Sequence, residues 1–238
     1  MVRAKTAPHQ PYKSDLTTSI LACITNGERI LDDAMQVEFQ RPPCTKLMLS
    51  MIAQEEFAKA FLLFLVREDV VPWSPQLLRA MNDHACKQLV GVIIEYVDPE
   101  WETLEELQKI VAEDVELGDR LPSKVGSAID ILRHEKIRRW ESNNWVWDEE
   151  PNYEPSVLRI AEGKRDRIKQ DALYVRLGRD GSVASMPTTV TQASVDEEYE
   201  KASRYSRFVI SVVRDGAHNS TAYKKVRETL KILFHDQG

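Results

Sequence analysis

The stretch SMIAQEEFAKAFLLFLV, Ser50 to Val66, decides the fold of this chain. Apolar residues fill both ends of the stretch, as in a helix that packs in a core, but Glu55, Glu56 and Lys59 interrupt them. On a helix, Glu56 lies three residues from Lys59 and Glu55 lies four, so either acid can pair with the lysine. These charges therefore form either an exposed stripe stabilised by ion pairs or a network kept at the edge of the core.

The rest of the chain also predicts mainly helices. Apolar positions recur at helical spacing, and Ser74-Pro75 and Asp98-Pro99 each place a capping residue before a proline at the first helical position. The expected helices span about 14–40, 43–67, 75–97, 99–117, 123–145, 152–170, 194–216 and 221–235. The sequence thus predicts one all-α domain over residues 1–238.

Three segments interrupt the helical pattern. Residues 1–13 are polar and are expected to form a flexible tail. Strand-like residues followed by the turn Asp180-Gly181 predict a small β-hairpin over 172–186. Trp140, Trp145 and Trp147 mark a Trp-rich insert that could stack bases, bind a protein or cover the core.

Composition excludes several classes of function. The net charge of -6 argues against a broad nucleic-acid-binding surface, although the basic clusters 133–140 and 163–169 either line an RNA path or are solvated faces. No apolar run is long enough for a membrane span, and residues 1–15 contain no secretory h-region, so we expect a cytoplasmic protein. The sequence has no Glu-x-x-His pair, no metal-type Cys/His cluster and no glycine-rich phosphate loop, so no metal or cofactor is expected.

Three segments in order resemble one known family. NGERILDDAMQ (26–36) followed by LMLSMIAQEEFAKAFLL (47–63) resembles the opening helical hairpin of AbiV-type abortive infection proteins. These are bacterial anti-phage proteins of the HEPN superfamily, and their Glu-Glu pair with a following Lys is matched by Glu55, Glu56 and Lys59. His84 followed by Lys87, and later KRDRIKQDALYVRLGRDGSV (164–183), also match. The resemblance implies a HEPN-like helical bundle.

The resemblance also implies a site at Arg79 and His84. HEPN ribonucleases are similar to one another chiefly in an arginine separated from a histidine by four to six residues, and four residues separate this pair. Histidine exchanges a proton near neutral pH and can act on a ribose 2′-hydroxyl, while arginine can hold the scissile phosphate through two donors. Such a pair cleaves RNA without metal and leaves a 2′,3′-cyclic phosphate. The alternative is a solvated Arg79 beside a half-buried, structural His84.

The neighbours of this pair carry further expectations. Where the family often has a polar residue after the arginine, this chain has Ala80, so we expect Asn82 to bind phosphate or Asp83 to orient a ring nitrogen of His84. On one continuous helix, five residues correspond to a rotation of about 140°, so Arg79 and His84 would not share a face. The family solves this with a cleft composed of two protomers, which implies a homodimer.

The acidic pair can then support the site. The short loop 68–74 favours antiparallel packing and should bring His84 near the turn that holds Glu55 and Glu56. We expect Glu55, Glu56, Lys59 and Lys87 to form a supporting network in which Lys59 offsets the cost of burying a carboxylate.

The resemblance leads to two alternative functions. The leading expectation is an anti-phage, metal-independent endoribonuclease with RNA as substrate and a phage protein as activator. The alternative is a non-catalytic HEPN interaction module that inhibits translation or senses a phage protein by binding.

Overall fold

The computed structural model describes residues 11–98, 122–137, 152–218, 231 and 234. Within these residues the fold is all-α, with a single two-stranded hairpin. The Trp-rich insert, the expected fourth helix, nearly all of the expected last helix and most of the expected tail lie outside the described residues. No described helix has both the length and the apolar character that a membrane span requires.

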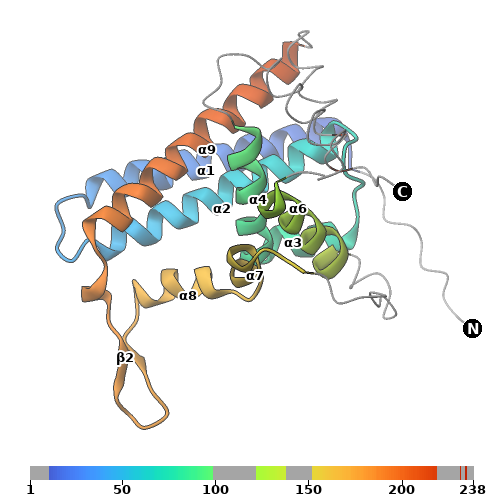
Figure 1. Cartoon of the computed structure of the whole chain (residues 1–238). Coiled ribbons are helices and arrows are strands. Elements are labelled where there is room, and N and C mark those ends of the chain that lie inside the picture. The colour runs from blue at the N-terminus through green and yellow to red at the C-terminus, as the bar shows by residue number, and fades with distance from the viewer. Residues whose placement is uncertain (1–10, 99–121, 138–151, 219–230, 232–233, 235–238) are drawn as a thin grey trace, which may run out of the picture.

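Three long helices form the frame of the molecule (Figure 1). They are α1 (Lys13–Gln36), α2 (Cys44–Arg67) and α9 (Gln192–His218), and α2 packs against both of the others. Every residue of α2 from Ala60 to Arg67 is buried, and Phe57, Phe61 and Phe64 are fully buried. The Phe61 ring lies 5.7 Å, between centroids, from Phe208 of α9. The apolar stretch Ser50 to Val66 is therefore the central element of the core, because large buried side chains contribute most to hydrophobic stabilisation.

Shorter helices complete the bundle and position the site (Figure 1). α4 packs against α2, α6 and α7, while α8 packs against both α2 and α4. The bounds of the shorter elements are α3 (Pro75–Asn82), α4 (His84–Val97), α6 (Ser123–Asp130), the π-helical η1 (Ile131–Ile137), α7 (Pro155–Ala161) and α8 (Lys164–Asp171).

The expectation of one continuous helix over 75–97 is wrong. The chain breaks at Asp83, whose φ of -87° and ψ of 126° are extended, and α4 starts afresh at His84. The Asp83 side chain accepts a hydrogen bond of 2.9 Å from the backbone N–H of Cys86, as an N-capping residue does. The angle of about 140° expected between Arg79 and His84 therefore does not apply, because the two residues lie on different helices.

The expected single helix over 152–170 is also wrong, since α7 ends at Ala161 and α8 begins at Lys164 after Gly163, whose φ is 76°. The remaining helix ends differ from expectation by a few residues. α1 ends at Gln36, α9 begins at Gln192 and continues through Gly216, and the expected helix from 123 becomes π-helical at Ile131.

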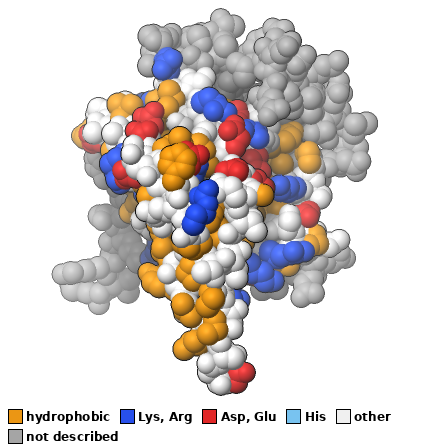
Figure 2. All heavy atoms as spheres, turned by 90° about the vertical axis from the view of Figure 1, so that its left-hand side faces the viewer, with side chains coloured by type: hydrophobic (Ala, Val, Ile, Leu, Met, Phe, Trp, Pro, Cys, Tyr) orange, Lys and Arg blue, Asp and Glu red, His pale blue; other side chains and the backbone are white. Residues whose placement is uncertain are grey.

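The hairpin lies inside the expected range and projects from the helical body (Figure 1). Its strands are β1 (Arg176–Leu177) and β2 (Val183–Ser185), followed by the 3-10 turn η3 (Pro187–Thr189). Leu177 pairs with Val183, so both side chains lie on one face, and each is more than half exposed. Figure 2 shows hydrophobic side chains gathered along this projection. The hairpin thus presents an apolar surface that the described part of the chain does not cover.

The close approach of α1 to α2 depends on Gly27. A Cβ atom at this position would lie 2.6 Å from Cε1 of the fully buried Phe57. We predict that Gly27→Ala destabilises the protein by about 1–3 kcal/mol despite the better helix propensity of alanine, because the core must shift to admit the methyl group. Urea denaturation measures the effect.

The matched control is Thr25→Ala, an exposed position on the same turn of α1. It should leave the free energy of unfolding within about 0.5 kcal/mol of wild type. Equal stability of Gly27→Ala and wild type would show that the Phe57 ring is free to move away.

Candidate functional site

The Glu55 carboxylate is the centre of the site. Its side chain is only 4% exposed, yet both oxygens have cationic partners. Lys169 Nζ of α8 lies 2.7 Å from Oε1, and Lys87 Nζ of α4 lies 2.9 Å from Oε2. Burial alone would raise the pKa of Glu55, but the hydrogen bonds and charges of Lys169 and Lys87 outweigh it and lower the pKa to about 2. Glu55 is therefore an ionised carboxylate inside the protein.

His84 is held by this carboxylate. Its Nδ1 atom lies 2.6 Å from Oε2 of Glu55, so the expectation that His84 lies beside this turn of α2 is confirmed. Because the carboxylate is ionised, a contact this short requires a proton on Nδ1, and Nδ1–H donates to Oε2. The side chain of His84 is still 52% exposed. In the neutral ring the other nitrogen, Nε2, is then a proton acceptor.

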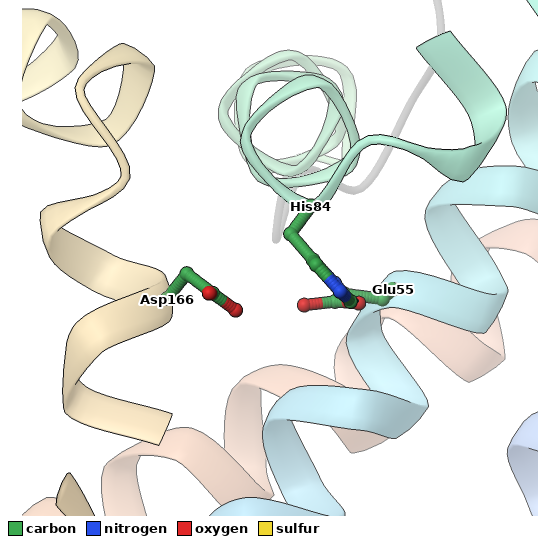
Figure 3. Close-up of side chains that lie close together, drawn as sticks. All are labelled: Glu55, His84 and Asp166. Carbon is green, nitrogen blue, oxygen red and sulfur yellow. The ribbon is translucent and has the colours of Figure 1, made fainter. Parts of the chain in front are cut away.

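Asp166 of α8 completes a group of three possible metal ligands. Figure 3 shows His84 and Asp166 pointing toward Glu55 from α4 and α8, and the ligand atoms of all three residues lie within 4.8 Å of one another. However, Lys169 Nζ contacts each of them: 2.7 Å to Glu55 Oε1, 2.8 Å to Asp166 Oδ1 and 3.1 Å to His84 Nδ1. An ammonium group thus lies among the three donors where a metal ion would have to bind, and the donor set does not fit a metal while Lys169 is in place.

Glu55 and Glu56, the adjacent acids of α2, lie in two different environments. Glu56 pairs with Lys59 at 2.5 Å, and both of these side chains are partly exposed. Glu55 instead turns inward to Lys87 and Lys169. The expectation that Lys59 supplies the cation for a buried carboxylate is therefore wrong, whereas the expected contact of Lys87 with the acidic turn is confirmed.

The other predicted site residues lie apart from the carboxylate. Arg79 is exposed on α3, and its guanidinium has no hydrogen bond or ion pair within the described residues. Asn82 donates to the backbone oxygen of Leu78 at 2.9 Å. Asp83 caps α4 and does not orient a ring nitrogen of His84; Glu55 does so.

Sequence reasoning missed the role of α8. Arg165 Nη2 donates to Gln54 Oε1 at 2.9 Å and to Glu198 Oε2 at 2.6 Å, which joins α8 to α2 and α9. Lys169 lies one turn further along the same face of α8. In the sequence, Arg165 and Lys169 form an i, i+4 pair of cations within the basic cluster 163–169, which indicates that they share one face of a helix. The sequence did not show that their acidic partners would be Glu198 and Glu55.

A second, smaller feature adjoins the carboxylate. A pocket with room for about one water molecule is lined by Glu55, Gln88, Gly91 and Tyr205, among others. The buried Oε1 atom of Gln88 has no hydrogen-bond partner within the described residues.

Comparisons of the chain with protein-family models, with curated proteins and with solved structures find no match. The chemistry open to the site therefore follows from its geometry. An imidazole with one nitrogen bound to an ionised carboxylate and the other available is arranged as a general base, as in other histidine–carboxylate pairs.

Adjacent glutamates provide a matched test of the network. Glu55→Gln leaves Lys87 buried without a carboxylate and Lys169 with Asp166 alone, so we predict a loss of about 3 kcal/mol in the free energy of unfolding. Glu56→Gln removes a partly exposed pair and should cost less than about 1 kcal/mol. Denaturant unfolding of both variants measures the difference, and similar losses would contradict the buried network.

The pKa of Glu55 predicts a pH dependence of stability. Because the pKa is about 2 in the folded chain and 4.5 in its reference state, the folded protein holds fewer protons, and its stability rises with pH between these values. The stabilisation is complete above pH 4.5 and is lost as the pH falls toward 2. The stability gap between wild type and Glu55→Gln should therefore narrow in acid. A gap that stays constant down to pH 2 would contradict the assignment of an ionised Glu55.

Proposed function

We propose that this chain is a metal-independent endoribonuclease of the HEPN type that acts in anti-phage abortive infection by cleaving RNA and so halting translation. The observation that carries the proposal is the contact of 2.6 Å between His84 Nδ1 and Glu55 on a half-exposed ring. A purely structural histidine needs no ionised partner at one nitrogen and solvent access at the other. The resemblance to AbiV-type proteins supplies the RNA substrate and the biological setting.

The proposed reaction uses the free ring nitrogen. Nε2 of His84 takes the proton of a ribose 2′-hydroxyl, the 2′-oxygen attacks the adjacent phosphorus, and the bond to the 5′-oxygen breaks. The leaving 5′-oxygen takes a proton from water, the other product carries a 2′,3′-cyclic phosphate, and His84 returns its own proton to the solvent. Glu55 holds the ring in the tautomer that leaves Nε2 available, as the carboxylate of a catalytic triad does.

Arg79 is proposed to bind the scissile phosphate. Its guanidinium is exposed and unpaired within the described residues, so it is available for a bidentate contact with phosphate oxygens. Its place on α3, a separate helix from that of His84, is compatible with the homodimer that the resemblance implies, in which two protomers form one cleft.

A second candidate function is favoured by the hairpin. Tyr174, Val175, Leu177 and Val183 are each more than half exposed on a projecting element, and contiguous exposed apolar surface is typical of a protein-binding site. The chain would then be a non-catalytic interaction module that binds a phage protein or a component of translation.

The test is an RNA cleavage assay in EDTA. We predict that wild type yields 2′,3′-cyclic phosphate ends and that His84→Ala loses about 10²–10⁴-fold in rate, because a positioned proton-transfer group contributes this much. Since the His84 side chain is half exposed, the melting temperature should change little.

The opposite pattern, a destabilised variant that still cleaves, would reject His84 as the base. A wild type that leaves RNA intact but forms a complex with a phage protein, lost in Leu177→Ser, would favour the interaction module. The hairpin variant also serves as a control, because it lies outside the site and should cleave RNA normally if the enzyme proposal holds.

A further inference from the structure

The position of Lys169 is the least expected feature of the site. Its side chain is only 10% exposed, although lysine side chains are rarely buried without a purpose or a partner. Its ammonium group contacts Glu55, Asp166 and His84 together, at 2.7, 2.8 and 3.1 Å. The residue comes from a part of the chain 114 positions away from Glu55.

The number of protons on Lys169 and His84 determines which of these contacts are hydrogen bonds. An ammonium group has three N–H donors. Glu55 Oε1 accepts one of them, while Asp166 Oδ1 lies 2.8 Å from the ammonium as an ion pair without a hydrogen bond. His84 Nδ1 cannot accept another while it carries the proton that goes to Glu55 Oε2. The contact of 3.1 Å to the ring is therefore that of a neighbouring charge, and Lys169 acts on His84 through the carboxylate.

We propose that Lys169 is a positioning residue of this site: by fixing Oε1 of Glu55, it leaves Oε2 aligned with Nδ1 of His84 and so determines which ring nitrogen carries the proton. The catalytic importance of this positioning role rests on the proposed ribonuclease function. The tautomer itself is a property of the folded protein without RNA.

The lysine is in turn held by its own helix. Asp166 lies one turn before Lys169 and pairs with it, and Arg165 of the same helix is fixed by Gln54 and Glu198. These contacts set the position of α8 against α2 and α9. Lys87 lies 2.9 Å from the second oxygen, Oε2, whereas Lys169 lies 2.7 Å from Oε1, so the two lysines hold different oxygens of the carboxylate.

The experiment is nitrogen NMR of the histidine rings in the full chain, with His84 assigned from His84→Ala. In wild type at neutral pH, the neutral ring of His84 should show a protonated Nδ1 and an unprotonated Nε2. In Lys169→Met, which keeps a long side chain but removes the charge, this pattern should give way to a mixture of both tautomers. Lys164→Met is the matched control, because Lys164 is exposed on the same helix and pairs only with Glu162 among the described residues.

Two further measurements make the outcome decisive. If Lys169→Met does not fold, Asp166→Asn removes one anchor of the same ammonium at a side chain that is 19% exposed, and a smaller shift toward the mixture is expected. A wild-type His84 pattern in a folded Lys169→Met or in Asp166→Asn would overturn the proposal. Added zinc that binds wild type and shifts the His84 ring signals would also overturn it, since the three donors would then serve a metal.

The readout separates this inference from the proposed function. If Lys169→Met shows a mixture of His84 tautomers and the wild type does not cleave RNA, the positioning role is supported and the ribonuclease is rejected. An active wild type whose His84 tautomer is unchanged in Lys169→Met would support the ribonuclease and reject the positioning role of Lys169. If the positioning role and the ribonuclease both hold, Lys169→Met should lower the rate of RNA cleavage. Lys13→Met, at an exposed lysine of α1 outside both basic clusters, should leave that rate unchanged.

Discussion

A single buried carboxylate constrains much of this structure. Taking the ionised Glu55 side chain out of water is costly, and the structure offsets the cost with one ammonium group on each oxygen. Lys87 and Lys169 come from α4 and α8, so the electrostatic requirement of one residue on α2 fixes how three helices meet. The hydrophobic core around Phe57, Phe61 and Phe64 holds α1, α2 and α9 together and also includes Leu89 and Val90 of α4. The carboxylate adds a polar constraint where α4 and α8 meet α2.

The same constraint shapes the exposed side of the site. A carboxylate whose oxygens are both occupied by lysines has a defined orientation, and His84 at the first position of α4 contacts it from the solvent side. The break in the chain at Asp83 makes this possible, because α4 can begin there with its own cap and direction. A charged group that contributes to the specificity of packing thus also presents an oriented imidazole.

The two candidate functions depend on different surfaces of the molecule. The ribonuclease needs the half-exposed His84 ring and the guanidinium of Arg79, whereas the interaction module needs the apolar face of the hairpin. α8 connects the two surfaces, since it contains Lys169 and leads directly into the hairpin that begins at Arg176. The division of roles can therefore be tested by variants on either side of this short helix without altering the core.

The sequence by itself determined the helical class, most helix positions and the hairpin, because helical periodicity, prolines after capping residues and an Asp-Gly turn act over a few residues. It also indicated that His84 would lie near Glu55. It did not determine which cations neutralise Glu55: local spacing favoured Lys59, three or four residues from each acid, while the partners are Lys87 and Lys169. Only the tertiary structure decided this, because the choice depends on which acid is buried. Lys59 lies with Glu56 on the partly exposed side of α2, and the inward side brings Glu55 to residues far away in the sequence.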